Sequence, residues 1–266
     1  MSRLLYAGLG LFVAVGACSL TTDLDGFHDP QVGPGDSGAS SLDGGHLPLA
    51  DAGAEGTTDA GPIDGGGSNV LFRDDFNRAN GPVGNGWLDP TKSYRIEDNH
   101  LPVNGSGWAF QTNTLYQPKR DDALDIKASV EYTALALPPN YPQVHIRVRP
   151  GASYECYAVG IPQDNVIFFG RCAPQNNFIS LGDQTLTENI VVGRTYRLSI
   201  SAKGTSPVHL TMELERKTDD GFALIGHHEA DDNAPERLGE PGAFGVSGDS
   251  SPNWVYDNFV VTKLTE

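Results

Sequence analysis

Aromatic residues in predicted loops are the side chains of this sequence best suited to bind a ligand. Aromatic rings stack on the apolar faces of pyranose sugars, while nearby Asn, Asp and Arg bond the hydroxyl groups. The candidates are Trp87, Trp108, Tyr116, Tyr141 and Trp254, with Asn113, Asn140 and Asn253 nearby. Trp108 lies among glycines and polar residues, and Tyr141 follows two prolines and Asn140, so these two rings lead. Core packing is the competing explanation for each ring, above all for Trp87 and Trp254.

Other residue types offer little chemistry. His227 and His228 are adjacent on a predicted strand, so they point to opposite faces and cannot easily share one metal ion. The sequence contains no Gly-x-Ser-x-Gly nucleophile turn, no Cys-x-x-Cys pair and no phosphate-cradling glycine loop. We therefore expect no organic cofactor and no catalysis of those kinds.

The elements that must position these residues are β-strands, most clearly over residues 123–172. Apolar residues at 124–132 alternate with polar ones, and Val144, Ile146 and Val148 alternate with His145, Arg147 and Arg149. Alternation with period two predicts strands with one apolar face and one wet face, as in antiparallel sheets.

A predicted hairpin follows, with its turn at residues 162–165. Cys156 and Cys172 lie at nearly equal distances from this turn, which places them opposite each other on the two strands. We predict a disulfide between them, the alternative being two buried thiols.

The N-terminus predicts export. Arg3 precedes an apolar run over residues 4–15, which is too short to span a bilayer but suits a signal peptide. Val15-Gly16-Ala17-Cys18 resembles the lipobox of bacterial lipoproteins, which implies cleavage after residue 17 and a membrane anchor through lipidated Cys18. In well-studied bacterial lipoproteins an Asp directly after the lipidated cysteine retains the protein at the inner membrane. Here Ser19 occupies that position. The expected location is the cell envelope, at the outer membrane or cell surface; an ordinary secretory signal is the alternative.

Residues 19–68 have the composition of a disordered tether. They contain no Lys or Arg, one aromatic residue (Phe27) and nine acids. A flexible chain of this length reaches about 40 Å. Of the 34 acids in the whole chain, 25 remain outside the tether against 17 bases once Arg3 is set aside, so the folded part carries about −8. An acidic domain on an acidic tether argues against a nucleic-acid partner.

Residues 69–266 predict a single all-β domain. A dozen or more short strands separated by turn signals indicate a two-sheet antiparallel sandwich of the jelly-roll type. Two segments carry a family resemblance: Phe72-Arg73-Asp74-Asp75-Phe76-Asn77-Arg78 with Gly84-Asn85-Gly86-Trp87, and Tyr256-Asp257-Asn258-Phe259 after Pro241-Gly242-Ala243-Phe244. They resemble the first and last strands of concanavalin A-like lectin/glucanase domains, a family that also includes laminin G-like modules.

The resemblance implies two sites that can be sought in the sequence. Glucanases of this fold carry Glu-x-Asp-x-x-Glu, or a motif one residue shorter, on one strand. Glu213 and Glu215 are two residues apart and so point to the same face of a strand, but Arg216 and Lys217 follow them instead of a third acid. Asp121 and Asp122 lie on a predicted turn. No catalytic residue is therefore assigned, and a solvated strand face explains the two glutamates.

The second implied site is one structural Ca²⁺ where the first and last strands meet. Asp257 occupies the corresponding place, with Asp74 or Asp75 opposite. Calcium prefers six to eight oxygen ligands, so these acids are only part of a site. The alternative is that they cap strand ends or bind backbone amides.

Three functions remain open. The first is a membrane-anchored, non-catalytic module that binds a polysaccharide or envelope glycan. The second is an interaction domain for an envelope protein, as in laminin G-like modules. The third is a divergent glycoside hydrolase, which would need two close carboxylates with perturbed pKa values in a cleft.

Overall fold

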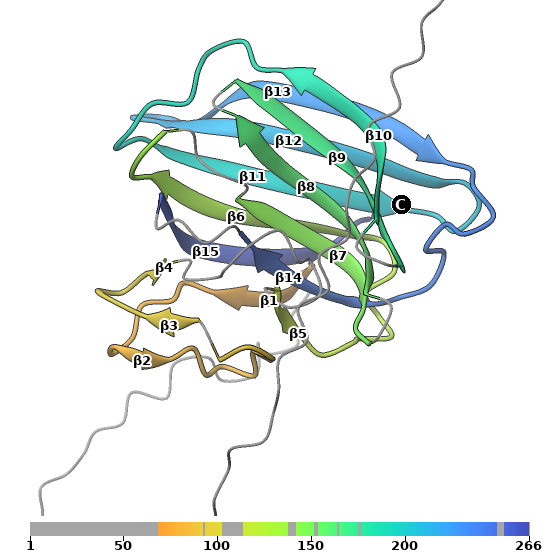
Figure 1. Ribbon diagram of the computed structural model, residues 1–266, viewed down its shortest axis with the longest axis horizontal. Helices are drawn as coiled ribbons and strands as arrows, with labels where there is room; N and C mark the ends of the chain where they lie inside the picture. Colours follow the sequence, from red (N-terminus) through yellow and green to blue (C-terminus); the bar gives the residue numbers. More distant parts are fainter. Residues whose placement is uncertain are drawn as a thin grey trace, which may run out of the picture. The chain divides into compact units, whose positions relative to one another are not determined.

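A computed structural model of the chain describes residues 69–92, 94–102, 114–137, 142–151, 154–163, 165–174, 177–248 and 253–265 (Figure 1). The predicted signal peptide, Cys18 and the tether lie outside these residues, as do the predicted ligand residues Trp108, Asn113 and Tyr141. Within the described part, no helix is long and apolar enough to cross a membrane.

The strands form two main sheets and one small one. The seven-stranded sheet has the order β1 (Val70–Asp74), β15 (Trp254–Lys263), β6 (Ile126–Ala134), β11 (Thr195–Lys203), β12 (Val208–Thr218) and β13 (Gly221–Asp232), with β4 (Leu101–Pro102) also pairing with β15. The six-stranded sheet has the order β10 (Asn177–Thr185), β9 (Val166–Ala173), β8 (Glu155–Gln163), β7 (Gln143–Arg149), β14 (Ala243–Ser247) and β5 (Thr114–Gln117). A two-stranded sheet joins β2 (Gly81–Pro82) to β3 (Arg95–Ile96).

The two large sheets face each other across one apolar core, and Figure 1 shows them as stacked layers. The paired strands are antiparallel throughout, for example β1 with β15 and β8 with β9. Val130 and Leu198 of one sheet and Val144 and Val159 of the other are fully buried in this core. The all-β, two-sheet jelly-roll sandwich predicted from the sequence is therefore confirmed.

The outer face of the seven-stranded sheet carries ion pairs, as the alternating pattern predicted. The Arg197 guanidinium donates two hydrogen bonds to Glu215, at 2.7 and 2.8 Å. Glu213 pairs with Lys127 of β6. Glu215 is thus tied to a cation on the adjacent strand β11, and Glu213 to one on β6, two strands away, in the arrangement expected of a polar strand face.

The outer face of β7 is different, and the prediction that it is wet is wrong. His145 and Arg147 are fully buried. The register of β7 against β8 shifts between Ile146 and Arg149, and Arg147 adopts a positive φ of 49°. A bulge of this kind re-aims a side chain, which period-two reasoning cannot foresee.

The re-aimed Arg147 guanidinium joins three separate segments. It donates to the Leu124 carbonyl oxygen at 2.9 and 3.1 Å, to that of Leu238 at 2.7 Å and to that of Gly204 at 2.8 Å. The Asp125 carboxylate lies 3.6 Å away. Arg147 thereby satisfies carbonyl groups at the ends of three connections, where no strand partner is present to do so.

We expect Arg147→Met to lower the free energy of unfolding by about 3 kcal/mol or more, because it leaves buried carbonyl groups without donors. Urea unfolding of the full chain measures this. Arg149→Met on the same strand is the control, since that side chain is 40% exposed and its contact with Glu155 is 3.7 Å; it should change stability by less than about 1 kcal/mol. Equal losses in the two variants would contradict the role assigned to Arg147.

Candidate functional site

The candidate site lies at the side of the sandwich where edge strands β1 and β5 and the small β2–β3 sheet are found (Figure 1). Leu88 pairs with Tyr116 of β5: the Leu88 amide donates to the Tyr116 carbonyl at 2.8 Å, and the Tyr116 amide donates back at 3.1 Å. The segment after β2 therefore extends the edge of the six-stranded sheet. It carries the residues that shape the adjoining pocket.

A pocket of about 370 Å³ opens between β2, β3 and the segment that joins them. Its lining consists of Pro82, Val83, Gly84, Trp87, Asp89, Lys92, Tyr94 and Arg95. Pockets that hold small ligands typically span roughly 300–1,000 Å³, with apolar walls and a few polar groups. The size and mixed lining of this pocket fall in that class.

The aromatic part of the lining is held rigidly. Trp87 packs edge-on against Phe72 and Phe259, with ring centroids 5.4 and 5.2 Å apart. Its indole Nε1 donates to the Asp74 carboxylate at 2.6 Å. Tyr94 is 2% exposed, and burial raises the pKa of its phenol well above the usual value, so the phenol stays neutral. The sequence favours the core for Trp87, which is confirmed, and Trp87 also belongs to the pocket lining.

The charged part of the lining stands at the rim. Asp89 is occupied locally: its Oδ1 accepts from the Thr91 amide at 3.2 Å and its Oδ2 from the Tyr94 amide at 2.8 Å. Lys92 adopts a positive φ of 54° in this turn. Lys92 and Arg95 are exposed, and no ion pair joins either of them to a carboxylate of the described residues.

The position of Trp87 in the pocket lining depends on the buried carboxylate of Asp74. Its Oδ1 accepts from the Phe76 amide at 2.8 Å and from Arg78 at 2.7 Å, and its Oδ2 accepts from Arg78, Asn85 and Trp87 at 2.6–2.9 Å. Burial alone would raise the pKa of Asp74, but these hydrogen bonds outweigh burial and lower it. Asp74 therefore stays ionised and fixes the segment that contains Trp87.

This arrangement bears on the predicted calcium site. Both oxygens of Asp74 are engaged by donors, one of them the cationic Arg78, so Asp74 does not fit as a calcium ligand. The Asp75 and Asp257 carboxylates accept from the amides of residues 77 and 258, as the strand-cap alternative expects. Burial raises the pKa of Asp257, helped by nearby Glu131 and Asp75. Within the described residues, no group of three or more His, Cys, Asp or Glu is placed to hold a metal ion; a site at Asp75 and Asp257 stays a prediction.

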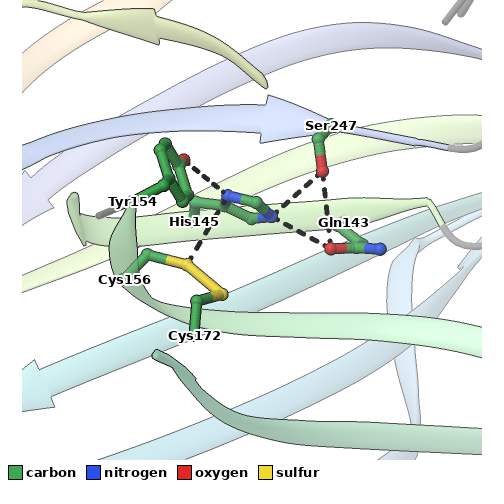
Figure 2. Close-up of a disulfide and its surroundings, with 6 residues drawn as sticks. All are labelled: Gln143, His145, Tyr154, Cys156, Cys172 and Ser247. Atoms are coloured by element: carbon green, nitrogen blue, oxygen red, sulfur yellow. Dashed lines mark hydrogen bonds between the residues drawn. A yellow bond between two sulfur atoms is a disulfide. The ribbon is translucent and has the colours of Figure 1, made fainter. Parts of the chain in front are cut away.

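Beyond Tyr116, the outer face of the six-stranded sheet carries a buried polar cluster around His145 (Figure 2). The ring Nε2 lies 3.0 Å from Gln143 Oε1 and 3.0 Å from Ser247 Oγ, and Nδ1 lies 3.0 Å from the Tyr154 hydroxyl. Because an amide oxygen can only accept, the ring proton belongs on Nε2, and Nδ1 accepts from Tyr154. Burial lowers the pKa of His145 to about 3, so the ring is neutral.

The predicted disulfide borders this cluster. Cys156 and Cys172 pair across β8 and β9 with their Cα atoms 4.9 Å apart, and the bond predicted from the hairpin is confirmed. The Cys156 Sγ lies 3.8 Å from His145 Nδ1 (Figure 2). Both sulfurs belong to a small apolar cluster that also contains Val148 and Ala243.

The predicted ligand residues relate to this face in different ways. Tyr116 is half-buried, and its ring packs against the small apolar cluster on the outer face. Trp254 is fully buried in the core, and the Asn253 carbonyl accepts from the amides of Leu135 and Ala136 at 2.6 and 3.2 Å. Trp254 and the backbone of Asn253 therefore have structural roles.

The remaining candidates lie outside the described residues, but the strands that follow them in the chain are described. Ser247, where β14 ends, pairs with Thr114, where β5 begins, and with Gln143, where β7 begins. The chain thus enters β5 and β7 in the same row of the sheet. Trp108 and Asn113 precede the first of these entry points, and Tyr141 precedes the second.

Sequence reasoning missed Lys92, Tyr94 and Arg95. The sequence predicts a strand over residues 94–97, but nothing in that pattern points to a pocket, which forms only when Pro82 of β2 pairs with Arg95 of β3. The signal that could have found them is the run Asp89-Pro90-Thr91-Lys92, whose composition is typical of a tight turn.

The His145 cluster predicts a specific pH dependence. In the unfolded chain His145 titrates near pH 6.5, and in the folded chain near pH 3, so between these values the unfolded state binds the extra proton. Stability from this group is therefore complete above pH 6.5 and falls by about 1.4 kcal/mol per pH unit on acidification. His145→Gln should be less stable at pH 7 and show a shallower loss toward pH 4 in urea unfolding.

Tyr154→Phe is the control for that experiment. It removes one hydrogen bond but keeps the titrating ring, so it should lower stability at pH 7 and retain the slope of the unmodified chain. If His145→Gln kept the same slope as Tyr154→Phe, the histidine would not be the group responsible.

No family model matches the chain, and no curated protein matches it. Among solved structures, it is similar to the CBM2 module of the evolved Dit protein of Lactobacillus casei BL23 phage J-1, with 10% identity, a TM-score of 0.46 and coverage of 75% of this chain and 98% of that chain. It is also similar to the carbohydrate-binding module CBM66 from Bacillus subtilis (15% identity, TM-score 0.41, coverage 67% and 96%). A third is the GH43 protein BlXynB from Bacillus licheniformis (12% identity, TM-score 0.47, coverage 72% and 39%), of which the chain spans about two fifths. At these TM-scores the likenesses carry no conclusion about ligand or activity.

Proposed function

We propose that the sandwich is a carbohydrate-binding domain that holds a sugar residue in the β2–β3 pocket at the edge of the six-stranded sheet. The observation that carries this proposal is the pocket itself, with Trp87 and Tyr94 in its lining and exposed hydrogen-bond donors at its rim. Sugars need an apolar surface for the ring and polar groups for the hydroxyls, and this pocket offers both.

The neighbouring face extends the proposed site. Leu88, which is 44% exposed, and half-buried Tyr116 lie side by side next to the pocket through their paired backbones. A glycan longer than one residue would continue from the pocket over these two side chains. Trp108, Asn113 and Tyr141 are proposed as further contacts, supported by the shared row from which β5 and β7 start.

The proposed domain binds without hydrolysing its ligand. Glu213 and Glu215, the acids with the parity of a catalytic pair, are engaged by Lys127 and Arg197. A glycosidase needs one protonated and one free carboxylate facing a shared cleft. Carboxylates paired with cations on a polar sheet face support a structural role instead.

The proposed location is the bacterial cell envelope, with anchoring through lipidated Cys18 and a tether over residues 19–68. The apolar run at residues 4–15 and the small residues before the cysteine support this proposal. A domain held in this way would reach glycans within about 40 Å of the membrane.

A second candidate function is binding of an envelope protein. The observation that favours it is a group of exposed apolar residues away from the pocket: Leu135, Val191 and Val192 are 48%, 51% and 49% exposed. Their segments are joined by the hydrogen bond from the Gly193 amide to the Ala134 carbonyl at 2.8 Å. Apolar side chains gathered on a surface commonly mark protein contacts.

Glycan binding is tested by incubating the purified full chain with a panel of polysaccharides and envelope glycans and measuring both retention and released sugars. We expect retention on at least one glycan without release. Tyr116→Ala should weaken that binding by about tenfold, while Tyr116→Phe keeps the ring and should bind within about twofold. Trp108→Ala tests the proposed loop contact in the same way.

Two results of the panel would contradict the proposal. Sugar release would show a hydrolase. Absence of retention on every glycan would leave the protein-binding surface at Leu135, Val191 and Val192 as the better explanation.

Anchoring is tested by expressing the full chain and Cys18→Ser in a bacterium and fractionating the cells. The unmodified chain should sediment with membranes and carry a mass increase on its N-terminal peptide, because diacylation supplies two buried chains. Cys18→Ser should leave the membrane fraction. Equal membrane association of both chains would rule out the lipid anchor.

A further inference from the structure

We propose that the β2–β3 pocket is selective for an anionic sugar residue, one that bears a carboxylate or a sulfate ester, with Lys92 and Arg95 binding the anionic group. This inference rests on the proposed glycan binding and specifies the class of glycan. It depends on the placement of two cations whose charges are not neutralised by an ion pair in the described part of the chain.

Lys92 and Arg95 differ from the cations that a carboxylate of this chain neutralises. Arg78, Arg120 and Arg197 each donate two hydrogen bonds to a carboxylate, at 2.7–3.0 Å. Arg73, Arg194, Lys203 and Lys263 are also exposed, and no ion pair joins them to a carboxylate of the described residues, but none of them lines the pocket. Lys92 and Arg95 are distinguished by lining one pocket together.

Asp89, the acid in the lining, does not cancel these charges. Its oxygens accept from the backbone and side chain of Thr91 and from the Tyr94 amide, and so brace the turn between them. One acid against two cations leaves the lining with a net charge of +1. An anionic ligand group gains from both cations, whereas a neutral sugar leaves their charges uncompensated.

The backbone fixes where the cations stand. Lys92 is held in the left-handed region by the Asp89 turn, whose carbonyl accepts from the Lys92 amide at 3.3 Å. Arg95 is fixed by the pairing of β3 with β2. On the other side, Gly84, Asn85 and Gly86 all have positive φ, and Asn85 donates to Asp74 at 2.9 Å. The pocket is thus shaped before any ligand arrives, which limits the entropy lost on binding.

The net negative charge of the protein opposes the binding of a long polyanion, and the probe must therefore be short. Charges are screened over about 8 Å at physiological ionic strength, so the two cations act on the residue in the pocket while the rest of the molecule repels a long chain. A short oligosaccharide avoids most of this repulsion. The test therefore uses trisaccharide-sized probes rather than polymers.

The experiment is isothermal titration calorimetry of the full chain with three probes: trigalacturonate, a carrageenan oligosaccharide that bears sulfate esters and no carboxylate, and a neutral galactan oligosaccharide of the same length. We expect one of the two anionic probes to bind more tightly than the neutral one. Comparison of the two anionic probes distinguishes carboxylate from sulfate recognition. The double variant K92A/R95A should lose about tenfold or more in affinity for the preferred anionic probe.

The matched control is K203A/K263A, which removes the same charge from two exposed lysines at the ends of β11 and β15, outside the pocket lining. It should bind the anionic probe within about twofold of the unmodified chain. Both double variants change exposed side chains, and urea unfolding verifies that each is folded.

Equal losses in the two double variants would overturn the inference, since the effect would then come from overall charge. Preference for the neutral probe would overturn it while leaving the proposed glycan binding intact. Failure of every probe, together with failure of the glycan panel, would overturn both.

Discussion

The buried carboxylate of Asp74 is the constraint on which the edge of this sandwich depends. It ends β1, and its two oxygens accept five hydrogen bonds that converge from Phe76, Arg78, Asn85 and Trp87. A buried carboxylate is costly unless its hydrogen bonds are complete, so the segment from β1 to Trp87 is held to one arrangement. That arrangement places the Trp87 ring between the core and the pocket.

Two further polar networks involve β7 of the six-stranded sheet. At one end of β7, the Arg147 guanidinium satisfies the carbonyl groups of three connections. Farther along the strand, neutral His145 links β7 to Ser247 of β14 and to Tyr154 (Figure 2). The His145 network lies on a face that would be solvated in a simple antiparallel sandwich, whereas Arg147 reaches carbonyl groups next to β6 and β11 of the other sheet. Fully satisfied buried networks of this kind favour one packing over its alternatives, and here they keep β7 in register beside the site.

The sequence predicted the fold well because the physics of a strand is local. Alternation marked β6, β11 and β12 directly, and the symmetric placement of Cys156 and Cys172 about a turn predicted their disulfide. The buried face of β7 could not be predicted, since a bulge at Arg147 depends on partners far away in the chain. The pocket could not be predicted for the same reason: it is made by a pair of two-residue strands, and of its lining only Trp87 carried a signal readable in isolation.

Hydrogen–deuterium exchange of the full chain, with and without a saccharide that it retains, tests the central claim most directly. The account predicts that bound saccharide slows exchange in residues 82–95 and in β5, because the ligand would cover the pocket and restrain the segment paired with Tyr116. Slowed exchange confined to β11, β12 and β13 would contradict the account. In that case the ligand would lie on the ion-paired sheet, and the pocket at Trp87 would have no part in binding.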